Sequence, residues 1–298
     1  MKYLDPKNDL TFKKIFGEHT NLIKSLLNAL LPLAEGQQIE EVEYLTPEQV
    51  PVIPELKNSI VDVRCKDNRG RHFIVEMQML WTSYFAKRVL FNCAKTYTGQ
   101  LGAGQGYESL QPVYALSLIN SIVRKESEDY IHHFSIINNK NIGDKIEGFE
   151  YVFVELPKFK PANFSEKKME VLWLRLLTEI DEDNHGLPEG LENSAAEIQQ
   201  ALEILKESSF DQKQLAAYDH YRDAVRVELT VEASARERVE KGREEGREEG
   251  RAEGRAEGRA EGEVIGMEKA ARNLLSLGVS IEKIQVATGL SAEEINRL

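Results

Sequence analysis

The chain has 298 residues, of which 41% are hydrophobic, and its formal net charge is −12. This length suits one large domain or two modest ones, with enough apolar residues for a packed core. No apolar run approaches the roughly 18 residues of a membrane span, and the amino-terminal residues lack the apolar run of an export signal. Cys65 and Cys93 lack the spacing of metal ligands, so we expect reduced thiols in a cytoplasmic protein.

The first predicted element is a helical region over residues 8–31. Apolar residues recur there at steps of three and four, and Asn8 or Asp9 supplies a start signal. Gly17 is expected to divide the region into two helices. Pro32 ends the helical pattern, because proline cannot continue a helix.

Two adjacent lysines, Lys13 and Lys14, lie on the first of these helices. One interpretation is that the helix packs beside a functional site and contributes one of these cations, or an acid such as Asp9 or Glu18. The alternative is that all four are ordinary solvated residues of a capped amphipathic helix. The sequence of the helix alone does not distinguish the two.

Residues 59–78 predict a β-hairpin. β-Branched residues surround Asp62, the segment 67–70 ends in a glycine suited to a turn, and an apolar run then carries Glu76 and Gln78. Side chains two residues apart on a strand share a face, so Glu76 and Gln78 point the same way. We expect Asp62 in the paired strand, which brings two carboxylates and an amide to one end of the hairpin.

Carboxylates in apolar strands are unfavourable unless a charge or a hydrogen-bonding group meets them. A hard divalent cation would meet them, because Mg²⁺ is held by one or two carboxylates together with water and substrate phosphate. The alternative is that Asp62 and Glu76 lie on a solvated face of the sheet, with Gln78 beside them. The residues of the hairpin leave both interpretations open.

Three short sequence motifs, in this order, resemble those of the Rpn family of bacterial recombination-promoting nucleases, which are also described as transposases. The motifs are N-D-L-T-F-K-K-I-F-G (8–17), V-D-V-R-C-K-D (61–67) and V-E-M-Q-M (75–79). An aspartate followed by Glu-x-Gln also resembles the PD-(D/E)XK nuclease core, with glutamine where lysine is usual. The similarity covers residues 1–235, the larger part of the chain.

This resemblance implies an α/β fold of αβββαβ order, in which helices flank a mixed central sheet. It also implies a DNA endonuclease that uses Mg²⁺, or Mn²⁺ or another divalent ion in its place. Carried over by position, Asp62 and Glu76 are metal ligands and Gln78 takes the third catalytic position. Lysine acts on the scissile phosphate as a cation, whereas glutamine only forms hydrogen bonds, so Gln78 puts the rate in question.

The acidic balance is unusual for a DNA enzyme, because phosphate contacts supply most non-specific affinity. The relevant charge is local, and cations are grouped around the hairpin. We expect Lys13, Lys14 and Arg88 to contact DNA, with Arg88 on a helix predicted over residues 81–101, where its guanidinium suits phosphate. Each of them has the alternative of a solvated surface charge. The wider set of candidates comprises Arg64, Arg69, Arg71 and Lys87.

Three further strands are predicted, over residues 113–119, 131–137 and 151–156. A glycine-rich segment, residues 102–106, precedes them. It follows a helix and precedes a strand, the reverse of a dinucleotide-binding motif, so we expect a plain loop. Glu155 is expected to be exposed at the edge of the sheet, with a place in the site as the alternative.

Beyond residue 160 the pattern is helical, with helices predicted over 169–180, 191–205 and 212–231. The chain thus divides into four parts. They are a nuclease-like core (1–160), a helical extension packed on the core (161–235), a charged glycine-repeat helix or tether (236–266) and a small helical module (267–298).

Glycine recurs every four residues from Gly242 to Gly266, with arginines in the following positions and glutamates before several of the glycines. On a helix this repeat lays each residue type on its own slowly winding ridge. Glycine costs about 1 kcal/mol relative to alanine in a helix, so the isolated helix should fray. We expect self-association through residues 241–266, because a glycine ridge permits close approach of two chains. The alternative is a partly helical tether.

The final module, residues 267–298, predicts helices separated by glycine turns, with a capping box at Ser291 and Glu294. Its arrangement superficially suggests a helix-turn-helix. The last helix, however, has few turns and carries more acid than base. We therefore expect this module to bind protein rather than DNA.

These observations favour a Mg²⁺-dependent DNA endonuclease that promotes recombination. We expect it to be a homo-oligomer in the cytoplasm that does not bind a membrane. The choice of DNA as substrate comes from the resemblance alone. The alternative is an inactive protein that keeps the nuclease fold and binds itself or a partner through its carboxyl-terminal helices. Metal binding by Asp62 and Glu76 would distinguish the two.

Overall fold

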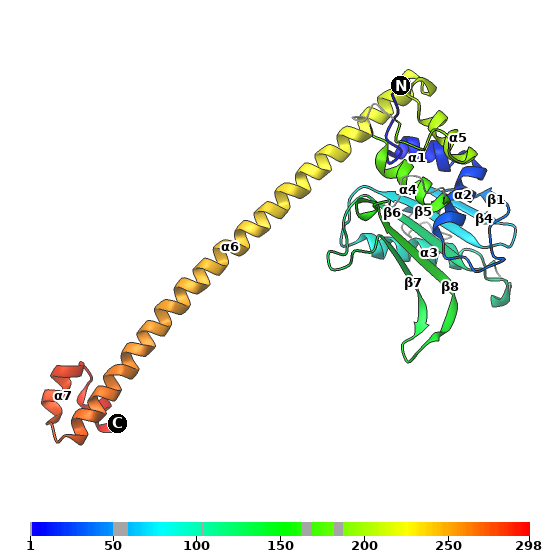
Figure 1. Cartoon of the computed structure of the whole chain (residues 1–298). Helices are drawn as coiled ribbons and strands as arrows, with labels where there is room; N and C mark the ends of the chain where they lie inside the picture. Colours follow the sequence, from blue (N-terminus) through cyan, green and yellow to red (C-terminus); the bar gives the residue numbers. More distant parts are fainter. Residues whose placement is uncertain (1, 50–58, 103, 162–167, 182–186) are drawn as a thin grey trace. The chain divides into compact units, whose positions relative to one another are not determined.

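The computed structural model divides into two compact units, Met1–Val227 and Glu228–Leu298, which are described here one at a time. Figure 1 shows the elements of each unit. The residues that the structure describes are 2–49, 59–102, 104–161, 168–181 and 187–298.

The amino-terminal region forms two helices, α1 (Asp9–Phe16) and α2 (Thr20–Leu30). The Asn8 side chain caps α1 by accepting a hydrogen bond from the Leu10 amide at 3.0 Å. Gly17 ends α1, and its amide donates the last hydrogen bond back into the helix. The prediction of two helices divided at Gly17 is confirmed.

The predicted hairpin is present as β4 (Val63–Asp67) and β5 (His72–Gln78), which pair antiparallel. Gly70 has a φ of 80°, the left-handed conformation that suits glycine in this turn. One detail of the prediction is wrong, because Asp62 is not inside the paired strand. It lies in a bend between β3 (Ser59–Ile60) and β4, since β3 pairs in a separate two-stranded sheet.

The main sheet has six described strands in the order β1–β4–β5–β6–β8–β7. Its central strands β5, β6 and β8 are parallel, so their carboxyl ends meet at one edge. At that edge Gln78 pairs with Ile119, and Ile119 pairs with Glu155. The bounds of the other strands are β1 (Val42–Tyr44), β2 (Glu48–Gln49, paired with β3), β6 (Val113–Ile119), β7 (Ile131–Asn138) and β8 (Asn141–Glu155).

Helices cover both faces of the sheet (Figure 1). On one face lie α1, α2, α4 (Met169–Glu179) and α5 (Ala196–Leu205), and on the other lies α3 (Phe85–Thr98). Alternate residues of β5 supply two separate cores, because Val75 belongs to the larger cluster and Ile74 to the cluster under α3. The even-numbered residues that follow Ile74 on β5 therefore face α3.

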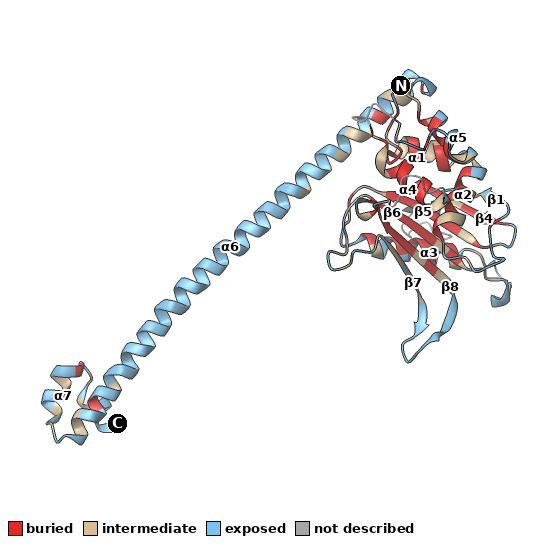
Figure 2. Cartoon of the chain, in the orientation of Figure 1, coloured by how far each residue is buried: buried red, intermediate tan, exposed pale blue. Residues whose placement is uncertain are grey.

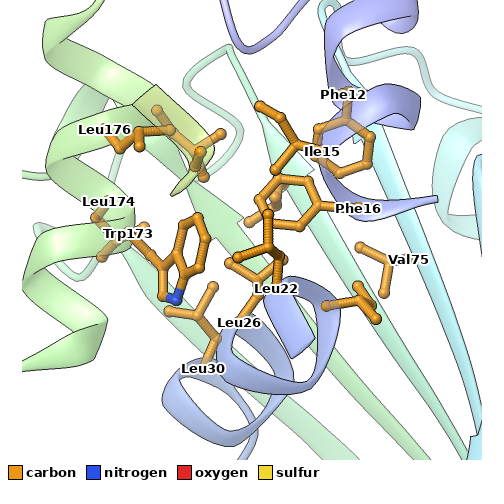
Figure 3. Packing of buried hydrophobic residues seen from close by; sticks show 14 of the residues in the cluster. Phe12, Ile15, Phe16, Leu22, Leu26, Leu30, Val75, Trp173, Leu174 and Leu176 are labelled. Carbon is orange, nitrogen blue, oxygen red and sulfur yellow. The ribbon is translucent and has the colours of Figure 1, made fainter. Parts of the chain in front are cut away.

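The larger core is built on aromatic and leucine side chains from three helices (Figure 3). The Phe16 ring is fully buried, and its centroid lies 5.3 Å from Trp173 and 4.9 Å from Phe12. The Trp173 indole N–H donates to the Ser25 hydroxyl at 3.0 Å, so the polar end of this buried ring is satisfied. These contacts fix α1 and α4 over the sheet that carries the hairpin.

The helix α6 (Gln212–Ser276) is continuous over 65 residues and joins three segments that the sequence predicted separately. Its glycine-repeat part is exposed (Figure 2). An added Cβ at Gly242 or at any of the repeat glycines up to Gly266 would meet no described atom within 4 Å outside the helix itself. Among the described helices none is both long and apolar enough to cross a membrane.

The second unit ends in two short helices, α7 (Ile281–Thr288) and α8 (Ala292–Arg297), which pack on the last turns of α6. The predicted capping box is present, because the Ser291 hydroxyl accepts from the Glu294 amide and the Glu294 carboxylate accepts from the Ser291 amide. Gly289 ends α7 with a φ of 74°. The small core consists of Ala271, Ile284 and Ile295, with partly buried neighbours.

Phe16→Ala should lower the free energy of unfolding of the first unit by about 3–5 kcal/mol, because it leaves a cavity against Trp173. Urea unfolding followed by tryptophan fluorescence measures this change. Tyr107→Ala, which removes a ring that is 83% exposed, is the control and should change the value by less than about 0.5 kcal/mol. Similar effects of the two substitutions would contradict the packing described.

Candidate active site

The predicted site residues meet at the carboxyl end of β5. The Asp62 carboxylate accepts a hydrogen bond from the Met77 amide at 2.7 Å, which ties the bend before β4 to β5. Glu76 and Gln78 leave β5 on the side of α3 and contact Asn92 and Arg88 of that helix. The structure thus brings Asp62, Glu76 and Gln78 to one edge of the sheet.

Glu76 is buried, with 5% of its surface exposed, and α3 holds it in place. Its Oε1 accepts a hydrogen bond from Asn92 Nδ2 at 2.9 Å, and the Arg88 guanidinium lies 3.5 Å from Oε2. Oε2 is buried without a hydrogen-bond partner among the described residues. Burial raises the pKa of Glu76 although Arg88 and Asn92 act in the opposite direction. One carboxylate oxygen is therefore fixed by Asn92, and the other has only the longer ion pair with Arg88.

Asp62 shares this desolvated environment. Burial raises the pKa of Asp62 to about 6, against the lowering effect of the hydrogen bond from Met77, and the charge of Glu76 adds to the rise. When both groups are ionised, the two carboxylates therefore repel each other with little water to screen them. A divalent cation between them would relieve this repulsion.

Gln78 is held at both ends of its amide. Its Nε2 donates to the Leu80 carbonyl at 2.6 Å, and its Oε1 accepts from Arg88 at 2.6 Å. The Arg88 side chain is 52% exposed and lies over the Phe85 ring at 5.0 Å. The glutamine lacks the charge of the lysine usual at this place, but it orients an arginine that carries a permanent one.

The two lysines of α1 have different surroundings. Lys13 forms an ion pair with Asp9 at 2.7 Å, and the charges of both residues influence the pKa of Asp62, so this side of α1 borders the site. Lys14 instead lies 3.8 Å above the centroid of the Phe210 ring. The structure brings Lys13 to the carboxylates and engages Lys14 elsewhere in the first unit.

The wider set of cations is spread over the hairpin. Arg71 is buried and pairs with Asp67 at 2.7 Å, and Arg69 donates to Gln37 at 2.6 Å. Both arginines lie at the turn, which is the opposite end of β5 from Gln78. They stabilise the turn and lie away from the carboxylates.

Asn92 is a site residue that the sequence reasoning missed. It is 1% exposed on α3 and donates to Glu76, while its own Oδ1 has no hydrogen-bond partner among the described residues. The available signal was a polar residue on the apolar face of a helix, four positions after Arg88. Such a residue is unfavourable in a core unless it meets a polar partner.

Glu155 also differs from the prediction, which placed it at an exposed edge. It is 1% exposed, accepts a hydrogen bond from the Val123 amide at 2.7 Å, and pairs with Lys158 at 3.1 Å and His132 at 2.9 Å. Burial raises its pKa, but these hydrogen bonds outweigh burial and lower the pKa of Glu155 overall. The residue is buried because β7 and the loop after β6 cover it, and it orders that loop.

The donor set fits a hard divalent cation that is shared with a substrate. In the part of the chain that the structure describes, no cluster of three or more His, Cys, Asp or Glu side chains could hold a metal by itself. Mg²⁺ does not require one, because it binds through one or two carboxylates, waters and phosphate oxygens. Asp62 and Glu76 supply the two carboxylates, and Glu76 supplies an oxygen that accepts no hydrogen bond from the described residues.

The mixed sheet with two acids at the end of a central hairpin defines a nuclease-like α/β domain. A family model described as "PD-(D/E)XK nuclease family transposase" matches residues 6–229. The chain belongs to this family, and the predicted resemblance and fold class are thereby confirmed. Membership places it among nuclease- and transposase-like proteins, with DNA as the implied substrate. No curated protein and no solved structure gives a significant match.

Asp62→Asn should stabilise the metal-free protein at pH 8 and stabilise it clearly less at pH 4.5. The pKa of about 6 in the folded state lies above the ordinary value of 3.8, so folding becomes less favourable as the pH rises through that interval. Asparagine carries no charge to desolvate, so it avoids this loss of stability, and its side-chain oxygen still accepts the hydrogen bond from the Met77 amide. We expect a gain of about 6–12 °C in Tm at pH 8 with chelator, measured by calorimetry.

Two controls accompany this measurement. Glu128→Gln, which neutralises an exposed acid, should leave the Tm unchanged at both pH values. Added Mg²⁺ should raise the Tm of the unsubstituted protein at pH 8 and not that of Asp62→Asn. A loss of stability in Asp62→Asn at both pH values would contradict the repulsion described.

Proposed function

We propose that this protein is a metal-dependent DNA endonuclease that hydrolyses phosphodiester bonds and promotes recombination. The observation that carries the proposal is the desolvated pair Asp62 and Glu76, with the Arg88 guanidinium beside a Glu76 oxygen that accepts no hydrogen bond from the described residues. Family membership supports the choice of nucleic acid as substrate.

In this proposal Asp62 and Glu76 hold Mg²⁺, with Mn²⁺ as a substitute. The bound ion would supply an activated water and offset the charge that develops on the phosphate. Asn92 fixes the orientation of Glu76, and Gln78 fixes that of Arg88. Arg88 then binds a phosphate oxygen, for which its planar guanidinium is suited.

The two lysines of α1 are the remaining proposed contacts to DNA. Lys13 borders the carboxylates and pairs with Asp9, which leaves it partly exposed for a phosphate near the site. Lys14 donates to the Ser209 carbonyl at 2.9 Å in addition to its ring contact, so its contact with DNA requires release from these partners. We therefore rank Lys13 above Lys14.

We further propose that the protein self-associates through residues 241–266. The repeat is exposed on all sides of α6, and no side chain covers its glycines in the described chain. A helix that is polar all round and rich in glycine has little intrinsic stability, so a partner helix would stabilise it. A DNA substrate and two free, buried cysteines suit the reducing cytoplasm as the compartment.

Cleavage of supercoiled plasmid tests the nuclease proposal directly. The unsubstituted protein should nick or linearise plasmid with Mg²⁺ and not with chelator. Asp62→Ala should reduce the rate by at least about 100-fold, because it removes a metal ligand. Glu128→Ala, which removes an exposed acid of the loop after β6, should cut at the original rate. The rates are read from the loss of supercoiled DNA on agarose gels.

Two other results would count against the proposal. Equal activity of the protein and of Asp62→Ala would point to a contaminant or to a site elsewhere. No cleavage with any divalent metal would favour the inactive protein that keeps the nuclease fold for binding.

Light scattering tests the self-association. Deletion of residues 241–266 should lower the molar mass to that of a single chain. Gly250→Gln with Gly254→Gln should do the same, because it blocks close approach while raising helix propensity. Ala252→Gln with Ala256→Gln, on another ridge of the repeat, is the matched control and should keep the mass. An unchanged mass after the deletion would refute the proposal.

A further inference from the structure

The segment around α3 has a local charge opposite to that of the whole chain. Residues 77–107 contain no aspartate or glutamate, although 50 of the 298 residues are acidic, about one in six. The same segment carries Lys87, Arg88 and Lys95, all three on α3. A positively charged surface on this acidic chain attracts negatively charged ligands.

The outer side of α3 also exposes large aromatic rings. Tyr84, immediately before the helix, is 73% exposed, and Phe91 is 46% exposed. They are seven residues apart, close to two helical turns, so they lie on one side of the helix. Lys87 and Arg88 lie between them, and the Lys95 ammonium is 5.9 Å from the centroid of the Phe91 ring. Aromatic rings and cations thus alternate along one face.

This face leads into the candidate active site. Arg88 donates to Gln78, and Asn92, one turn further, donates to Glu76. A linear ligand that lies along α3 from Phe91 to Tyr84 therefore passes the guanidinium beside Glu76. The geometry couples the face to the place where a phosphate would be cut.

The charge of the face decides between two possible occupants. In a symmetric contact with a second copy, the three cations of one α3 would meet those of the other, and such like-charge contacts are unfavourable. A nucleic-acid strand brings phosphates for the cations and bases for the rings. Bases in a duplex are stacked inside the helix, so only an unpaired strand presents their flat faces to side chains.

We infer that α3 is a binding face for an unpaired stretch of the DNA strand. Bases stack on Tyr84 and Phe91, and phosphates pair with Lys87 and Lys95. The inference rests on the proposed function and deepens it, because it makes the substrate DNA with a single-stranded or locally melted region. Stacking of one base on an aromatic ring strengthens binding by about 5- to 150-fold.

Binding without cleavage tests this inference. Fluorescence anisotropy is recorded for a labelled oligonucleotide of about 20 nucleotides, single-stranded or as a duplex, with full-length Asp62→Asn protein in chelator. The single strand should bind more tightly than the duplex. Adding Tyr84→Ala or Phe91→Ala should weaken single-strand binding at least about fivefold and leave duplex binding nearly unchanged. Adding Lys87→Gln should lower the slope of log Kd against log salt by about 0.7.

Matched controls come from exposed residues outside α3. Tyr107→Ala and Lys140→Gln, each in the same background, should bind the single strand as tightly as the parent protein. Melting temperatures equal to that of the parent would show that each variant is folded. Weaker binding caused only by Tyr84→Ala, Phe91→Ala and Lys87→Gln supports the inference.

The outcomes separate this inference from the nuclease proposal. Unchanged single-strand binding in Tyr84→Ala and Phe91→Ala, with a protein that cuts plasmid, overturns the inference and leaves the nuclease proposal intact. If single-strand binding depends on both rings but the protein cuts no DNA, the result supports α3 as a binding face and contradicts the nuclease proposal. A lower molar mass of Tyr84→Ala with unchanged binding assigns the face to a second copy and also overturns the inference.

Discussion

The candidate site depends on one constraint, the repulsion between two carboxylates that have lost most of their water. Asp62 and Glu76 can remain side by side only because other groups compensate for the lost water. A backbone amide of β5 donates a hydrogen bond to Asp62, Asn92 donates one to Glu76, and Arg88 forms an ion pair with Glu76. The compensation is incomplete, since one buried oxygen of Glu76 accepts no hydrogen bond from the described residues and the pKa values of both acids are raised. The protein therefore gives up some stability at this edge, a pattern common at functional sites, where local stability is sacrificed for chemistry.

Position on the sheet explains why these groups meet. Alternation along β5 sends Val75 to the larger core and Glu76 toward α3, so a single strand serves packing on one face and chemistry on the other. The bend at Asp62 frees its carboxylate from the regular ladder and lets it reach the Met77 amide. The acidic net charge of the chain is consistent with this site, because the segment that borders it is free of acids.

Local patterns predicted the elements that local chemistry determines. The cap at Asn8, the division at Gly17 and the turn at Gly70 each depend on a few neighbouring residues, and all are present. Contacts between distant segments were not predictable in this way. The bend at Asp62 exists because β3 pairs with β2, and Glu155 is buried because β7 covers it. β8 begins at Asn141 rather than at residue 151, because its first part pairs with β7 in an exposed hairpin that lacks a core pattern.

The four-residue period of α6 has a consequence for how this chain can vary in length. Insertion or loss of one repeat changes a helix by about 6 Å in length and about 40° in rotation. Such a change preserves the order of the glycine, arginine and glutamate ridges. It also lies outside the first unit and outside the small core that α7 and α8 form with the last turns of α6. The length of α6 can therefore change in small steps while every residue of either core stays the same.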